Sequence, residues 1–546
     1  MGNVLKKLRY LRRLTHRLPA EEQVQRLRQL LLPLRPMASS DAASHIVVQC
    51  VQDPFYLTLF AHLAHALRQR APLEAELLVC QSFNAAIGIG WKPWVMRAFP
   101  LNRLQVDQWI RLWDVVATRV AYRSSSLNYP LGDLIDAWRS WRLWRGLGSA
   151  DELEAVTIEG VICGDLVIDS YLRFRPSPRV EVGDLFMLRV LWQAHRDIRR
   201  AKNYFSSTRP LLYLTSYTTY VQHGIAARVA LQEGVRVFSF GNFQEFGKLL
   251  SKGDSFHTRN ALNYQRDFDQ LPEPALLMQE ATRQLEARLA GGIDIATSYM
   301  VSSAYRKTTS EVPDVRSAVV VFLHDFYDSP HVYADLVFPD FWEWICFTLD
   351  TLISAGIRFM VKPHPNQIAL NDTVINELLG RFPGLEMVAP EVTNRQLTDA
   401  GMACAVTVYG TVAHEMAYMG VPTIACARHP HVAFNFCRTA RTRASYADLL
   451  REALTQVCDR ESLREQALRF FVMHNLSLPP AQLALRDAFI STWKMFNDTL
   501  SDVSELSRSF VALAELPGYA IFIDEMLNGL ELTAQVCFTT KPGDVS

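Results

Sequence analysis

A histidine held between two prolines is the first feature of this sequence that could do chemistry. Lys362, Pro363, His364 and Pro365 follow one another at the end of an apolar run that predicts a buried strand. Because each proline ring restricts the backbone, the imidazole of His364 is presented in one orientation. Such an imidazole can donate to a phosphate and stabilise it as a leaving group. We therefore expect Lys362, His364 and Pro365 to bind phosphate, although Lys362 also fits an ordinary surface lysine.

A glycine turn between a strand and a helix is the second candidate. The segment 403–425 reads ACAVTVYGTVAHEMAYMGVPTIA. Gly410 lets the backbone approach a ligand, and the unpaired N–H groups at a helix start favour an anion. Thr411 could cap the helix and bind a phosphate oxygen, and Glu415 could accept hydrogen bonds from ribose hydroxyls. Similar turns also occur in α/β proteins without this function. The nucleotide-binding residues predicted in this segment are Tyr409, Gly410, Thr411, His414 and Glu415.

A loop rich in polar residues, LHDFYDSPH at 323–331, follows another apolar run. Loops at strand ends often carry chemistry because the sheet fixes their position. A carboxylate in this loop could act as a nucleophile or as a general base. We favour Asp328, because Ser329 and Pro330 would hold its backbone, and Asp325 is the alternative. The same residues also fit an Asx turn that caps the next helix.

Three carboxylates in the first half of the chain could serve as a general acid or base, or could bind an acceptor. Glu245 follows a predicted strand and is our candidate for a general acid or base, although an ordinary glutamate would look the same. Asp165 and Asp169 could fill this role instead or bind the hydroxyl groups of an acceptor. His223 lies at a predicted helix start and could bind the acceptor, cap the helix or lie in the core.

An α/β pattern predicts the elements that position these residues. The run HIVVQCV, the helical stretch after it and the run LEAELLVC form a βαβ unit, which implies a parallel sheet. The pattern continues through a helix at 185–204, a strand at 211–216 and a helix ended by Gly234. Residues 100–150 are rich in Trp and Leu and predict a helical insertion.

The same rhythm restarts after a polar stretch, Tyr305 to Arg316, which we take as the linker. Strands are predicted at AVVVFLH, IRFMVK, LEMVAP, ACAVTVYG and GVPTIAC, with helices between them, and the chain is mainly helical from Ser445. The predicted fold class is α/β, with two Rossmann-like lobes whose carboxyl edges face a cleft. The predicted domains are 1–40, a basic amphipathic helix; 41–310, a Rossmann-like lobe with the predicted acceptor residues; 311–490, a Rossmann-like lobe with the predicted nucleotide-binding residues; and 491–546, helices that pack back across the lobes.

Composition favours a cytoplasmic enzyme. Hydrophobic residues make up 49 % of the 546 residues and charged residues 21 %. No apolar run reaches the roughly 18 residues that span a bilayer, and the N-terminus lacks a secretory signal pattern. The nine cysteines are scattered without CxxC pairing, which favours free thiols in a reducing compartment.

Charge is concentrated near the N-terminus. Residues 1–35 contain nine Lys or Arg against two Glu, a net charge of +7, while the whole chain has net charge zero. Leu5, Leu8 and Leu11 fall at helical spacing between the basic residues. This segment could lie on anionic lipid at the inner membrane, or it could be a solvated helix or pack on a partner protein. No nucleic-acid partner is predicted.

A metal site is not predicted. No DxD sequence stands at a strand end in the second half, and His429 and His431 flank a proline without Cys or carboxylate neighbours. The basic segment that contains these histidines could clamp a carboxylate or diphosphate, or be a solvated loop.

The histidine–proline loop followed by GTVAHEMAYMGVP resembles the nucleotide-binding lobe of GT-B glycosyltransferases that build bacterial capsule and O-antigen polysaccharide. This resemblance covers residues 318–450, and it includes enzymes that use CMP-activated Kdo and sialic acid. GVICGDLVIDSYLRF at 160–174 and YVQHGIAARVALQEGVRVFSFG at 220–241 resemble segments of β-Kdo transferases. The resemblance implies that His364 and Thr411 hold the CMP phosphate and that Glu415 holds the ribose.

A retaining reaction follows from that resemblance. CMP-Kdo is a β-linked donor, so a β-linked product requires net retention, which two inversions through an aspartyl adduct would achieve. The expected activity is transfer of Kdo from CMP-Kdo, a substrate, to a lipid-linked or oligosaccharide acceptor, without a metal or other cofactor. The alternatives are a polyol-phosphate transferase of the teichoic-acid type and a sugar-nucleotide epimerase of the same fold.

Overall fold

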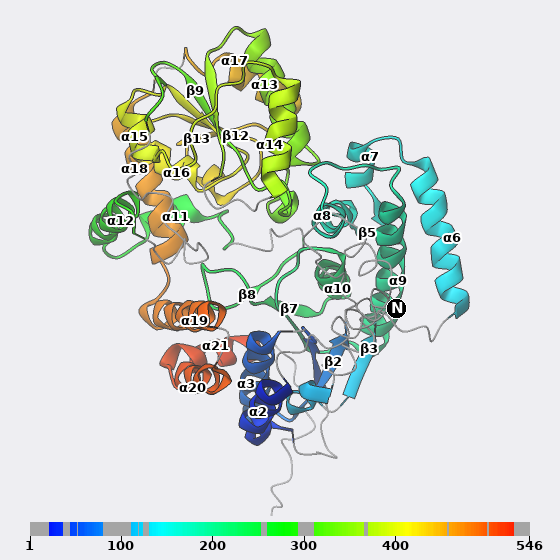
Figure 1. The fold of residues 1–546 in the computed structure, drawn as a ribbon. Helices are drawn as coiled ribbons and strands as arrows, with labels where there is room; N and C mark the ends of the chain where they lie inside the picture. The colour runs from blue at the N-terminus through cyan, green and yellow to red at the C-terminus, as the bar shows by residue number, and fades with distance from the viewer. Residues whose placement is uncertain are drawn as a thin grey trace, which may run out of the picture.

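Two parallel sheets organise the computed structural model (Figure 1). The residues that the structure describes are 21–36, 44–51, 53–79, 111–117, 119–123, 130–252, 259–292, 311–364, 370–455, 458–499 and 502–528.

The first sheet has the strand order β3-β2-β1-β6-β7-β8 and is parallel except for the β7–β8 pair. β1 and β6 are parallel, and the direction of winding reverses between them, because β2 and β3 extend the sheet on one side of β1 and the later strands extend it on the other. Its strands are β1 (Ser44–Gln49), β2 (Leu73–Val79), β3 (Arg119–Arg123), β6 (Leu212–Thr215), β7 (Arg236–Ser239) and β8 (Lys248–Leu249). A separate hairpin pairs β4 (Thr157–Ile158) with β5 (Val161–Ile162).

Helices cover both faces of this sheet, so its central strands are buried and almost continuously apolar. The helix after β1 begins where the Asp53 carboxylate accepts from the Phe55 amide and Pro54 occupies the first turn. The helices of the first lobe are α3 (Pro54–Arg70), η2 (Trp113–Val115), α6 (Pro130–Gly146), α7 (Ala150–Glu154), α8 (Gly164–Phe174), α9 (Leu185–Thr208) and α10 (Val221–Gln232).

The second sheet is wholly parallel, with the order β10-β9-β11-β12-β13. Here the direction of winding reverses between β9 and β11. The strands are β9 (Val319–Phe322), β10 (Phe359–Lys362), β11 (Cys404–Val406), β12 (Thr423–Ala425) and β13 (Cys437–Thr439). The helices of this lobe are η4 (Pro330–Val332), α13 (Phe341–Ser354), α14 (Leu370–Arg381), α15 (Asn394–Asp399), α16 (Val412–Tyr418), η5 (Pro430–Ala433), α17 (Arg443–Arg451), α18 (Arg460–Phe471) and the π-helix η6 (Val472–Leu476).

Two helices that precede the predicted linker pack on the second lobe. These are α11 (Tyr264–Asp269) and α12 (Pro274–Leu289), whose buried Tyr264, Phe268 and Leu285 share a core with α16 and α18. The packing therefore changes lobe before residue 264, which differs from the predicted boundary between 310 and 311.

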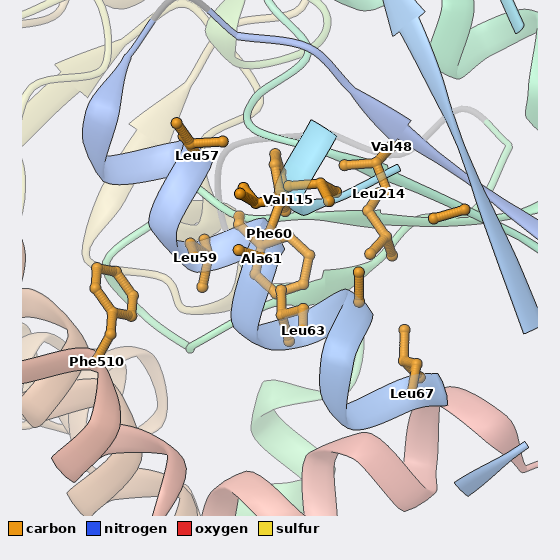
Figure 2. Packing of buried hydrophobic residues seen from close by; sticks show 14 of the residues in the cluster. Val48, Leu57, Leu59, Phe60, Ala61, Leu63, Leu67, Val115, Leu214 and Phe510 are labelled. Atoms are coloured by element: carbon orange, nitrogen blue, oxygen red, sulfur yellow. The ribbon is translucent and has the colours of Figure 1, made fainter. Parts of the chain in front are cut away.

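The C-terminal helices return to the first lobe. They are α19 (Pro480–Thr499), α20 (Val503–Ala514) and α21 (Pro517–Leu527), and they cover α3 together with α2 (Glu21–Leu31) and η1 (Leu32–Leu34). The ring centroids of Phe510 on α20 and Phe55 on α3 lie 5.2 Å apart, and Figure 2 shows Phe510 on the side of α20 that faces α3. Leu27 and Leu31 of α2 are buried in the same core. The predicted C-terminal unit at 491–546 therefore begins earlier, at Pro480, and packs on one lobe.

The structure confirms the α/β class with two Rossmann-like lobes and most predicted elements. Five observed strands were not predicted: β3, the hairpin strands β4 and β5, β8 and β13. β13 lies in the basic segment interpreted as a clamp or loop. The predicted strand LEMVAP is wrong, since Met387 makes only an isolated bridge to Val361. Most of the predicted basic helix, residues 1–20, lies outside the described residues.

We predict that Phe510→Ala destabilises the first lobe by about 3–5 kcal/mol, because it removes a fully buried ring from the core shared by α3 and α20. Thermal unfolding followed by circular dichroism measures the effect. Val511→Ala is the control, because its side chain is 47 % exposed on the same helix and should change stability by less than about 0.5 kcal/mol. Equal effects of the two substitutions would contradict this packing.

Candidate functional site

Three neighbouring strands of the second sheet end in residues with chemistry. His364 follows β10, His324 follows β9, and Tyr409 follows β11. The ring centroids of His324 and His364 lie 6.3 Å apart, and those of His324 and Tyr409 lie 5.0 Å apart. The point between β9 and β11, where winding reverses, is where open α/β sheets bind ligands. The histidine–proline loop and the glycine turn thus meet at one sheet edge.

Both imidazoles at this edge are held neutral. Burial lowers the pKa of His324 to about 4 and that of His364 to about 4, where the nearby His324 ring adds to the effect. His324 stacks on Phe341 with 4.9 Å between centroids. Within the part of the chain that the structure describes, its Nδ1 atom has no hydrogen-bond partner. A buried polar atom without a partner is costly, and a bound ligand would satisfy it.

The two candidate carboxylates in the loop after β9 differ in their surroundings. Asp325 accepts from the Tyr327 amide and from the Asn371 side chain, each at 3.0 Å, so it stabilises the loop. Asp328 accepts from the Ser329 amide at 2.9 Å and is exposed. Desolvation by the surrounding protein nevertheless raises the pKa of Asp328. A ligand can therefore approach Asp328 more easily than Asp325.

Residues of the first lobe reach the same loop. The Arg173 guanidinium of α8 donates to the Tyr327 carbonyl at 3.4 Å and is electrostatically coupled to Asp328. The Tyr220 side chain, which precedes α10, hydrogen-bonds the Ser329 side chain. Tyr220 has φ of 65° and ψ of 155°, a strained conformation that a non-glycine residue adopts only when its surroundings enforce it. The carboxyl edges of the two sheets therefore face each other.

A glutamine organises the point where winding reverses in the first sheet. The Gln49 carbonyl at the end of β1 accepts from Thr215 Oγ1 at 2.9 Å and from the Ser216 amide at 3.0 Å. Its amide nitrogen lies 2.7 Å from Nδ1 of His223. This network closes the junction of β1 and β6 with buried side chains.

Asp53 is the carboxylate nearest to that junction along the chain. Its side chain accepts from the Phe55 amide at 2.7 Å, and burial raises its pKa. It lies within electrostatic reach of Tyr56 and Tyr217. Tyr217 in turn is coupled to Arg173, which is coupled to Asp328. Asp53, Tyr217, Arg173 and Asp328 thus each lie within electrostatic reach of the next, from the first sheet edge to the loop after β9.

Sequence reasoning missed this set. Arg173 and Tyr220 lie in the segments 160–174 and 220–241 but were not singled out there. Asp53 and Tyr217 could have been found by applying the strand-end rule to the first lobe as strictly as to the second.

The helix after the glycine turn does not present its acidic residue to the site, which corrects a prediction. Glu415 is 1 % exposed; its carboxylate accepts from Arg288 at 3.2 Å and from Asn394 at 3.1 Å. His414 is buried between Arg288, at 3.1 Å, and His431, at 3.3 Å. Both side chains hold elements of the second lobe to one another. Neither is therefore placed to hold the ribose or the phosphate.

Three further predicted residues have protein partners instead of open positions. Lys362 is buried and donates to the Pro390 carbonyl at 2.9 Å, and burial lowers its pKa to about 8. Asp165 accepts from Arg228 at 2.7 Å. His223 lies between Gln49 and Gln222. These positions correct the proposed phosphate contact of Lys362 and the proposed acceptor contacts of the other two.

Asp169 also has a structural partner, which joins the lobes. Its buried carboxylate lies 2.8 Å from Nδ1 of His331 on η4, and Glu154 lies 3.7 Å from Nε2 of the same ring. Burial opposes the charge on His331, but these carboxylates raise its pKa to about 9. The acceptor contact predicted for Asp169 is therefore replaced by an ion pair between the lobes.

The remaining predicted residues keep their candidate positions. Gly410 and Thr411 lie at the β9–β11 edge, although Thr411 makes no side-chain cap on α16. Glu245 is half-buried after β7, where its amide donates to Asn242 and its charge reaches Tyr264. The call on Pro365 lies outside the described residues.

Further features of the described residues concern metal binding, membrane spanning and surface hollows. Across the described ranges, no group of three His, Cys, Asp or Glu side chains is arranged to hold a metal ion. In the same ranges, every helix is too short or too polar to cross a membrane. Two surface hollows lie away from the carboxyl edges, one beside Tyr418 and Arg464 and one beside Phe359 and Phe382.

Comparison with known proteins gives distant likenesses. No family model and no curated protein sequence matches the chain. The β-Kdo 2,4 transferase of Thermosulfurimonas dismutans is 12 % identical with a TM-score of 0.29, over 48 % of this chain and 79 % of that chain. A Methanocaldococcus jannaschii UDP-GlcNAc 2-epimerase, in complex with UDP-GlcNAc and UDP, is 10 % identical with a TM-score of 0.24, over 77 % and 97 %. The Thermobaculum terrenum O-GlcNAc transferase is 11 % identical with a TM-score of 0.28, over 88 % and 74 %.

The ion pair between the lobes predicts a pH dependence of stability. His331 is protonated in the folded protein up to about pH 9 but only up to about 6.5 when unfolded, so the folded state binds the extra proton. Its stabilising contribution is complete below the unfolded pKa and is lost as pH rises through the folded pKa. Asp169→Asn should therefore lower the free energy of unfolding by about 3 kcal/mol at neutral pH. It should also abolish the decrease in this free energy as pH rises from 6.5 to about 9, which urea unfolding across this pH range would measure.

Asp184→Asn is the matched control for this experiment. Asp184 pairs with Arg175 at 2.8 Å, and arginine does not titrate in this range. In the control variant, the free energy of unfolding should still decrease as pH rises towards 9. A decline of equal size in Asp169→Asn and the wild type would contradict the charged pair.

Proposed function

We propose that this chain is a glycosyltransferase whose nucleotide-sugar donor binds at the carboxyl edge of the second sheet. One observation carries the proposal: two imidazoles, His324 and His364, meet the Tyr409 turn at the β9–β11 junction, and an approachable carboxylate, Asp328, lies in the same loop system. An anion between the imidazoles would favour their protonation and would gain hydrogen bonds from both. The site is suited to a phosphate that must leave with negative charge.

The proposed donor is CMP-Kdo, and this choice comes from the resemblance of residues 318–450, 160–174 and 220–241 to surface-polysaccharide enzymes. The acceptor is proposed to be a glycan, on a lipid carrier at the cytoplasmic face of the inner membrane or as an oligosaccharide. CMP is a monophosphate leaving group, so the proposal includes no bridging cation.

In the first half-reaction, Asp328 is the nucleophile. A carboxylate oxygen attacks the anomeric carbon, the bond from that carbon to the phosphate oxygen breaks, and its electron pair leaves on CMP. His364 and His324 donate to that phosphate. Because attack comes from the face opposite the leaving group, the covalent intermediate has inverted configuration.

In the second half-reaction, an acceptor hydroxyl attacks the anomeric carbon and releases the Asp328 carboxylate. A general base must remove the hydroxyl proton. We propose Asp53 for this role in preference to Glu245. The raised pKa of Asp53 fits a proton acceptor, and Asp53 follows the end of β1 at the junction where the winding of the first sheet reverses. Two inversions give net retention.

Nucleotide selectivity tests the donor class. CMP should raise the melting temperature more than UDP, GDP or CDP at equal concentration, since a ligand at about 100 times its Kd stabilises by about 2.7 kcal/mol. His364→Ala should abolish most of this shift, whereas His65→Ala, a change on α3 of the first lobe, should preserve it. Equal shifts with all four nucleotides would contradict a CMP donor.

Intact-mass analysis with CMP-Kdo tests the two carboxylates. Asp328→Asn should form no adduct, because an amide cannot act as the nucleophile. Asp53→Asn should accumulate an adduct of one Kdo, because the second half-reaction loses its base while asparagine still caps α3. Glu245→Gln is the matched control and should turn over about as fast as wild type, within about twofold.

Two outcomes would distinguish the alternatives. The pair of adjacent imidazoles also fits a polyol-phosphate transferase, which moves a phosphoryl group and needs no carboxylate nucleophile. Full activity of Asp328→Asn with a CDP-polyol donor would support that reaction and overturn ours. Consumption of a nucleotide sugar without any acceptor would support an epimerase instead.

A further inference from the structure

Helix α6 of the first lobe presents its apolar side to solvent. The exposed residues follow the spacing i, i+3, i+4, i+7 and i+10, which places them on one face of a helix. They are Leu131, 77 % exposed; Leu134, 67 %; Ile135, 51 %; Trp138, 54 %; and Trp141, 49 %. Figure 1 shows α6 on the outside of the first lobe, next to α9.

The opposite face of α6 carries its acidic residues and faces the protein. Asp133 and Asp136 are 4 % and 1 % exposed. Arg199 of α9 donates to both carboxylates at 2.8 Å. A side chain at Gly132 would collide with the Arg199 guanidinium, because an added Cβ would lie 2.9 Å from Cζ. The helix is thus attached to α9 through charge, and this attachment turns the apolar residues outward.

This arrangement is the reverse of an ordinary surface helix, which buries its apolar face. Ser140 adds to the attachment, with Oγ 2.9 Å from Nδ1 of His195. Because specific buried ion pairs hold α6 in this orientation, the exposed face is a built feature of the fold. Large exposed apolar faces mark surfaces that bind a partner.

The outward face is also positively charged. Arg142 and Arg145 are exposed among the apolar residues, and the Arg142 guanidinium lies 4.9 Å from the centre of the Trp138 ring. Both acidic residues of α6 point inward, so this helix offers no carboxylate on its outer face. Tryptophan with arginine is typical of the boundary between lipid headgroups and acyl chains.

We propose that this face of α6 docks on an anionic lipid surface. The alternative occupant, a second copy of the chain, fits less well. A twofold contact would place the same face against itself and bring arginines together without an acidic residue of α6 between them. Anionic headgroups supply the missing negative charge, and the aliphatic and indole side chains enter the interface. This proposal rests on α6 and α9 and is independent of the catalytic proposal.

Vesicle co-sedimentation of the full chain tests it. The wild type should bind vesicles of phosphatidylcholine with about one third phosphatidylglycerol and should bind pure phosphatidylcholine weakly. Trp138→Ser/Trp141→Ser should weaken binding to the anionic vesicles about tenfold or more. Arg142→Glu/Arg145→Glu should weaken it to a similar extent and reduce its sensitivity to salt.

Leu185→Ser/Leu262→Ser is the matched control. These two leucines are 72 % and 83 % exposed on other segments, and the variant should bind vesicles as the wild type does. All variants keep the basic residues 1–35, so vesicle binding that survives the tryptophan substitutions would assign membrane contact to that segment and overturn the proposal. A wild-type dimer that becomes monomeric in the tryptophan variant, measured by light scattering, would assign α6 to self-association and would equally overturn it.

Discussion

The loop after β9 is held between the two sheets, and the rest of the candidate site depends on that position. Asp169 and His331 form a buried ion pair across the lobes, Tyr220 bonds Ser329, and the Asp340 carboxylate accepts both from its own helix start and from the Val180 amide of the first lobe. These contacts place the carboxyl ends of two parallel sheets opposite each other. A charged pair taken out of water needs good geometry and further hydrogen bonds, so it specifies one arrangement of the lobes.

Electrostatics separate the residues that support the site from those that could react. Asp169, Asp165 and Glu415 each accept from a cationic side chain and are largely withdrawn from solvent, so their charges are already used. Asp328 accepts from the Ser329 amide, lies within electrostatic reach of Arg173, and remains exposed. His324 and His364 are kept neutral by burial, which lets them respond to an arriving anion.

Docking on an anionic lipid surface and catalysis between the two sheet edges would use different parts of the first lobe. The junction is built from strand ends and from α8, whereas α6 is attached to α9 by arginines on the outside. The proposed transfer to a lipid-linked glycan would need both, because the bilayer would hold the acceptor and the protein would have to approach it. The basic charge of residues 1–35 and the arginine-bearing face of α6 suit the same kind of surface.

Alternating strand and helix patterns in the sequence determined the two-lobed α/β class and most element positions, since apolar periodicity reports local burial. They also indicated that His364 and Gly410 would reach one edge, because parallel strands end together. Tertiary structure alone decided which polar residues remain available. In the sequence, Glu415 and Asp169 are acidic candidates just as Asp328 is. In the structure they are paired with Arg288 and His331, which come from distant segments of the chain. The outward apolar face of α6 likewise follows from arginines on another helix, and local periodicity does not specify which side a helix turns toward its neighbour.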